Sequence, residues 1–147
     1  MKNKHLLEIV VVVLALIVSF SGTVSTVSAA EVRIIANKNV PVSSISSDML
    51  KDIFLGKKNT WDNGMKIEFA TRDPGDLQNN FLKTYLQKSP VQYSNYWKQQ
   101  VFTGKGQLPK AFDSDKAMLD YVASMNGAIG SVSDSADTGS VKVITVK

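Results

Sequence analysis

The stretch KIEFATRDPGDLQNNFLKTYL, residues Lys66–Leu86, decides the fold because it predicts a strand, a tight turn and a helix in direct succession. Ile67, Phe69 and Thr71 alternate with polar or small residues, which is typical of a half-buried strand. Pro and Gly in the turn at residues 73–76 end the regular structure. The helix that follows has one apolar face, formed by Leu77, Phe81, Leu82, Tyr85 and Leu86.

The junction of this strand and helix brings together two groups that attract anions. Arg72 ends the strand, and the first turn of the helix presents backbone N–H groups that have no partner within the helix. A guanidinium and a helix N-terminus that converge on one point can form an oxyanion site. We therefore predict an anion-binding site, without catalytic or metal-binding residues, made of Arg72, Gly75, Asp76, Leu77 and Gln78.

One alternative competes with this prediction. Arg72 could instead pair with Asp73, Asp76 or another acid at the surface, where an ion pair contributes little. Lys57, Lys58 and Lys105 are possible assistants in anion binding, although each also fits a solvated loop position.

The N-terminal thirty residues predict a secretory signal peptide rather than part of the fold. Lys2 and Lys4 precede an apolar run over residues 6–20 in which Glu8 is the only charged residue, and small residues at 27–30 suit cleavage after Ala29 or Ala30. An uncleaved membrane anchor is the rival interpretation, but the apolar part is shorter than the roughly 20 residues that a span needs. We expect a signal at residues 1–30, a single domain at residues 31–147 and a periplasmic or secreted protein.

Composition excludes several classes of chemistry. The single histidine, His5, lies in the predicted signal and the chain has no cysteine, so Ser-His-Asp and Cys-His catalysis, thiol redox chemistry and common zinc or copper sites are absent from residues 31–147. We expect neither enzymatic activity nor a cofactor. The 15 Lys and Arg residues after position 30 exceed the 12 Asp and Glu residues only slightly and are scattered, which argues against nucleic acid binding.

The rest of the chain predicts three more strands, at residues 31–36, 128–132 and 141–146, and three more helices. The order β-α-β-α-α-α-β-β indicates an α/β structure with a small, mostly four-stranded sheet flanked by helices. Tyr93, Trp97 and Val101 form a helical stripe that we assign to the core. Trp61 could be a binding platform, but we expect it to cover the sheet edge.

Five segments in a common order resemble the substrate-binding proteins of phosphate ABC importers, which have the type 2 periplasmic binding protein-like fold. They are SSDMLKDIFLGK (46–57), WDNGMKI (61–67), RDPGDLQNNF (72–81), FTGKGQLP (102–109) and NGAIGSV (126–132). Full-length members hold the oxyanion between two lobes, and this chain resembles one lobe. The resemblance implies a single lobe with a small mixed sheet, weak binding of inorganic phosphate, and a transporter or second-lobe partner, but no membrane contact after signal cleavage.

The site differs from the pattern that the resemblance implies. The family typically has an Arg followed by Ser-Gly-Thr before the helix, whereas Gly75, Asp76 and Leu77 occupy those three positions here. We expect Asp76 to be the N-cap, where it would compete with an anion for the N–H groups. Alternatively, its carboxylate accepts a proton from monohydrogen phosphate and so favours phosphate over sulfate.

A second hypothesis is a scaffold that uses the lobe to bind a protein and no small ligand. The contact surface would then be an exposed apolar patch that includes Trp61 or the helix of Tyr93 and Trp97.

Overall fold

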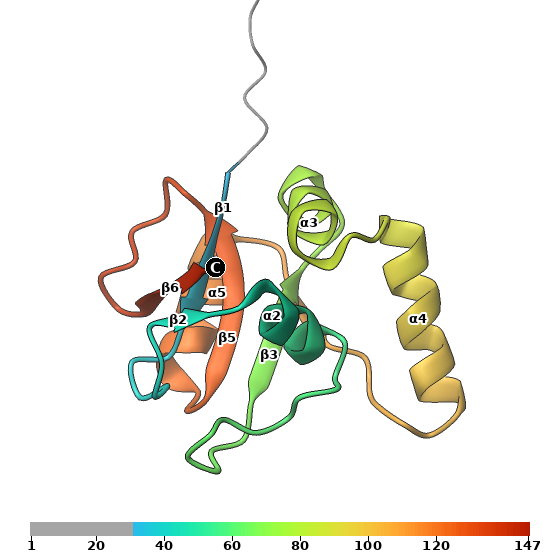
Figure 1. Cartoon of the computed structure of the whole chain (residues 1–147). Coiled ribbons are helices and arrows are strands. Elements are labelled where there is room, and N and C mark those ends of the chain that lie inside the picture. Colours follow the sequence, from blue (N-terminus) through green and yellow to red (C-terminus); the bar gives the residue numbers. More distant parts are fainter. Residues whose placement is uncertain (1–30) are drawn as a thin grey trace, which may run out of the picture.

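A computed structural model describes residues 31–147 as a mixed six-stranded sheet with helices on both faces (Figure 1). The predicted signal at residues 1–30 lies outside the described residues. The elements are β1 (Val32–Ala36), β2 (Ser44–Ile45), α2 (Ser47–Phe54), β3 (Glu68–Arg72), α3 (Asp76–Phe81), η1 (Leu82–Leu86), α4 (Pro90–Phe102), β4 (Lys110–Phe112), α5 (Asp115–Ser124), β5 (Ala128–Ser133) and β6 (Lys142–Val146). The predicted α/β fold class is confirmed.

The strand order is β2-β6-β1-β5-β3-β4. Strand β1 runs antiparallel to both β5 and β6, whereas β3 runs parallel to β5 and to β4. The sheet has two more strands than the sequence predicts, because β2 and β4 are only two and three residues long. Such short edge strands lack the alternating pattern that identifies a strand in a sequence.

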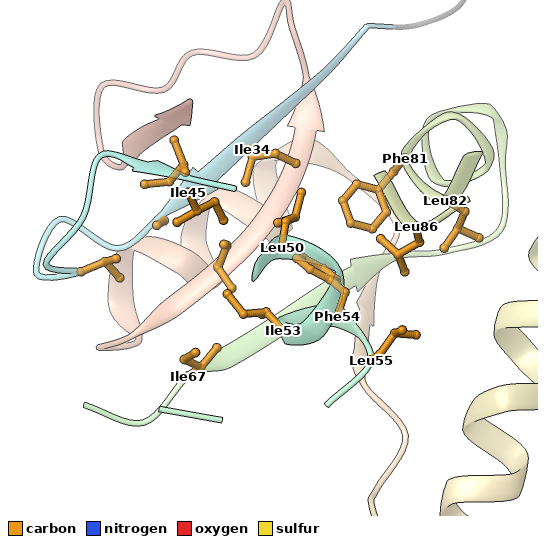
Figure 2. Packing of buried hydrophobic residues seen from close by; sticks show 14 of the residues in the cluster. Ile34, Ile45, Leu50, Ile53, Phe54, Leu55, Ile67, Phe81, Leu82 and Leu86 are labelled. Carbon is orange, nitrogen blue, oxygen red and sulfur yellow. The ribbon is translucent and has the colours of Figure 1, made fainter. Parts of the chain in front are cut away.

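Two groups of buried residues occupy the two faces of the sheet. The alternation of side chains along β1 sends Ile34 to the face covered by α2 and α3, and Ile35 to the face covered by α5. Figure 2 shows the first group, in which Phe54 of α2 and Phe81 of α3 lie with ring centroids 4.7 Å apart. Among the described residues, both faces of the sheet are thus covered by buried apolar side chains.

Helix α4 stands beside the rest of the domain in Figure 1 and packs through one stripe. Tyr93 and Trp97 are buried, which confirms their assignment to the core, and the Tyr93 hydroxyl donates to the Phe54 carbonyl oxygen at 3.0 Å. Burial raises the pKa of the Tyr93 phenol. The prediction for Val101 is wrong, because α4 has no buried residue after Trp97 and Val101 is 43% exposed.

Trp61 is buried and donates from Nε1 to the carbonyl oxygen of Gly127 at 3.0 Å. It therefore lies in the core and cannot serve as a binding platform. Its partner Gly127 precedes the inner strand β5, so Trp61 does not cover the sheet edge as the sequence predicts. Trp61, Tyr93 and Trp97 are all at least nine-tenths buried, so they cannot form the patch of the scaffold hypothesis themselves, whereas Val91 and Phe102 of the same helix α4 are exposed. Within residues 31–147, no helix combines the length and apolar character needed to cross a bilayer.

Candidate oxyanion site

A hollow of about 350 Å³ lies where β3 ends and α3 begins. All five residues predicted from the sequence to bind a ligand line it, so the structure brings them together at one place. The lining residues are Arg72, Asp73, Pro74, Gly75, Asp76, Leu77, Gln78 and Asp113. Their role in binding stays a prediction.

The start of α3 has no side-chain cap, unlike the starts of the other three α-helices that the structure describes. The hydroxyls of Ser46, Ser89 and Ser114 cap α2, α4 and α5 by accepting a backbone N–H. At α3 the N-cap is Gly75, which has no side chain to accept a hydrogen bond. Helix α3 continues directly into η1 through Leu82, whose backbone is helical.

The expectation that Asp76 caps this helix is wrong. Gly75 is extended, with φ 163° and ψ −179°, and its carbonyl oxygen accepts the N–H of Asn79 at 2.9 Å. The cap position therefore falls one residue earlier than expected, and Asp76 becomes the first helical residue. The N–H groups of residues 76–78 precede the first bond of the helix and have no partner within it.

The guanidinium of Arg72 lies against the start of α5. Its Nη1 atom is 3.2 Å from Asp115 Oδ1, an ion contact without hydrogen-bond alignment, and its Nη2 atom donates to the Asp113 carbonyl oxygen at 3.2 Å. Only 13% of the Arg72 side chain is exposed. The charge is thus held in the wall of the hollow, and the acid that pairs with it is Asp115 rather than Asp73 or Asp76.

Asp115 is itself held by the end of β5. The backbone N–H of Ser133 donates to Asp115 Oδ1 at 3.2 Å, and the Ser133 hydroxyl donates to Asp115 Oδ2. A chain of polar contacts therefore connects β3, α5 and β5 behind the hollow. The sequence shows no sign of this network, because Arg72, Asp115 and Ser133 are far apart along the chain and Asp113-Ser114 predicts only a helix cap.

Gln78 connects α3 to β3. Its side chain is buried, and Oε1 accepts the backbone N–H of Arg72 at 3.1 Å. This bond fixes the position of Arg72 relative to the helix start, and it occupies the Oε1 atom of Gln78.

Lys57, Lys58 and Lys105 do not line the hollow, and Lys58 pairs with Asp62 at 3.2 Å.

The hollow offers both donors and carboxylate acceptors. Among the described residues that line it, Arg72 is the one cation, whereas Asp73, Asp76 and Asp113 are acidic. A fully ionised oxyanion would meet repulsion there, but an oxyanion that still carries a proton can accept from N–H groups and donate to a carboxylate. Among residues 31–147, no three His, Cys, Asp or Glu side chains gather where they could hold a metal ion.

Comparison with known proteins places the chain in a family. A family model described as PBP superfamily domain matches residues 26–144. No curated protein sequence matches the chain.

Solved structures of phosphate-binding proteins share the fold. An ABC-type phosphate transport receptor from Vibrio cholerae matches with a TM-score of 0.53 and 20% identity, over 78% of this chain and 45% of the receptor. PstS from Borrelia burgdorferi matches with a TM-score of 0.62 and 14% identity, over 79% of this chain and 47% of its own. A phosphate ABC transporter substrate-binding protein from Clostridium perfringens, solved with bound phosphate, matches with a TM-score of 0.58 and 21% identity. The match covers 78% of this chain and 44% of that protein. The chain thus spans less than half the length of these proteins.

Proposed function

This chain belongs to the family of PBP superfamily domains, and from that premise we propose that it is an exported solute-binding-like protein that binds phosphate, or a similar oxyanion, in the hollow at the start of α3. The observation that carries the proposal is the uncapped helix start beside Arg72. Helix N-termini bind anions because their N–H groups and dipole both favour negative charge. The proposed role is ligand binding without catalysis or a cofactor.

The proposed binding is weak because only one wall encloses the ligand. An anion in an open hollow keeps part of its hydration, so each hydrogen bond contributes less than in a closed cleft. The pairing of Arg72 with Asp115 weakens it further, since the anion must compete with a carboxylate for the guanidinium. A transporter subunit or a second-lobe protein would supply the missing wall, in keeping with the transport roles named for the similar structures.

Phosphate should bind residues 31–147 with a dissociation constant in the millimolar range, and sulfate should bind much more weakly. The acidic lining selects an anion that can donate a hydrogen bond, and at neutral pH phosphate retains a proton that sulfate lacks. Phosphate affinity should rise between about pH 8 and about pH 6, where phosphate groups gain a proton and lose charge. Titration calorimetry at constant ionic strength measures both effects.

Sulfate is the matched control because it has the same shape without the proton. Equal affinities for the two anions, or a phosphate affinity that rises with pH, would contradict the assignment of the carboxylates as acceptors. Absence of any heat with phosphate at every pH, together with amide NMR spectra that phosphate leaves unchanged, would remove the proposed function itself.

A further inference from the structure

The outward face of α4 carries exposed apolar side chains at both of its ends. Val91 and Phe102 are 68% and 92% exposed, and at 3.6 residues per turn they share one stripe with Lys98. The opposite stripe holds the buried Tyr93 and Trp97. The helix therefore presents bulky apolar groups to solvent with a lysine between them.

The loop after α4 adds to this surface. Backbone bonds from Thr103 to the Gln99 carbonyl oxygen at 3.0 Å, and from Lys105 to that of Gln100 at 2.8 Å, fold the loop back on the helix end. Leu108 in this loop is 66% exposed, and Val101 at the helix end is 43% exposed. We define the α4 face by its apolar and basic members, Val91, Lys98, Val101, Phe102, Lys105 and Leu108.

Charge is distributed unevenly between residues 77–112, which include α4 and the loop after it, and the rest of the chain. Residues 77–112 contain five lysines and no acidic residue. The rest of residues 31–147 contains all 12 acidic residues and the other 10 basic residues. Two of the five lysines, Lys83 and Lys88, line a second hollow of about 500 Å³ that reaches Ser89 and Pro90 at the start of α4. The α4 face is thus part of a basic region that suits a negatively charged partner.

We propose that the α4 face docks on the surface of an anionic lipid bilayer. Phe102 at the helix end is almost fully exposed and lies on the same stripe as Lys98, so this stripe offers an aromatic ring that can insert between headgroups and an ammonium group that can meet lipid phosphates. Lysine side chains can bury their stems at the interface while their ammonium groups meet lipid phosphates. This role is independent of the hollow at α3, and it departs from the expectation that the chain has no membrane contact after signal cleavage.

Co-sedimentation of residues 31–147 with lipid vesicles tests the proposal. Vesicles of phosphatidylglycerol and phosphatidylcholine in equal parts should bind the protein at low ionic strength, and vesicles of phosphatidylcholine alone should not. The double variant Lys98→Glu/Lys105→Glu should lower the partition coefficient by on the order of tenfold or more, since each lysine near the surface contributes to binding. The variant Phe102→Ser/Leu108→Ser should also weaken binding, because it removes the inserting groups.

The matched control is Lys38→Glu/Lys147→Glu, which makes the same change in net charge at two exposed lysines, one in the turn after β1 and one after β6. It should bind like the unchanged protein, as should Arg72→Ala, and circular dichroism checks that every variant is folded. Equal losses in the control and the α4 variants would show attraction by net charge only and overturn the proposal. It would also be overturned by absence of vesicle binding, by full binding of Phe102→Ser/Leu108→Ser, or by a dimer in solution that the α4 variants dissociate.

Discussion

Replacing Gly127 with alanine is expected to cost at least about 3 kcal/mol of unfolding free energy. An added Cβ would lie 2.0 Å from the backbone oxygen of Lys66, and φ at this residue is +76°, a conformation that alanine adopts only at a cost. The carbonyl oxygen of Gly127 also accepts bonds from Trp61 Nε1 at 3.0 Å and from the Glu68 N–H at 3.2 Å. Relief of the clash would therefore disturb the start of β3.

Gly64→Ala is the matched control for this prediction. Gly64 has a similar φ of +82°, but nothing lies within 4 Å of an added Cβ. The control should lose only the conformational part, about 1 kcal/mol. Urea unfolding measures both losses, and the midpoint of thermal unfolding of Gly127→Ala should fall by more than about 10 °C. Equal losses in the two variants would contradict the close approach of residue 127 to residue 66.

Arg72→Ala is expected to lower phosphate affinity by roughly 10-fold to 100-fold, because it removes the charged donor of the hollow. Asp115→Asn should act in the opposite direction and raise the affinity by up to about fivefold, in line with the small contribution of a partly exposed ion pair. An amide at position 115 leaves the guanidinium without a competing carboxylate and can still accept the N–H of Ser133. Calorimetric titration with phosphate measures both changes.

Arg33→Ala is the matched control, since Arg33 is the only other arginine after position 30. Its Nη1 atom is 3.5 Å from the Ala136 carbonyl oxygen, and it does not line the hollow. The control should bind phosphate with unchanged affinity. If Asp115→Asn weakened binding as much as Arg72→Ala, Asp115 would be needed to position the guanidinium, and the competition between carboxylate and anion would be refuted.

The main elements of the fold could be predicted because their signals are local. The helix of Phe81 and Leu86 shows its apolar face in the sequence, and Ser89-Pro90 marks a helix start that the structure confirms with a capping box. Strand β4 escaped prediction because its hydrogen bonds depend on pairing with β3, from which 37 residues of chain separate it in sequence. Local pattern thus identifies the long elements but misses the short edge strands.

The candidate site could be predicted only in part, for a similar reason. Residues 72–78 are contiguous, so their meeting at one turn follows from the strand and helix that flank it. The contact of Arg72 with Asp115 depends on the parallel pairing of β3 with β4, which brings the start of α5 to the end of β3. Nothing in the local sequence of either residue indicates that pairing, so the acid that balances Arg72 could not be named.

The most direct test of the proposed oxyanion site is a phosphate titration of residues 31–147 followed by amide NMR spectra. We expect the N–H resonances of residues 75–78 to shift progressively and to saturate at millimolar phosphate, with little change along β2 and β6. Unchanged resonances at residues 75–78 under the same conditions, or equal shifts across the whole spectrum, would contradict an anion site at the start of α3.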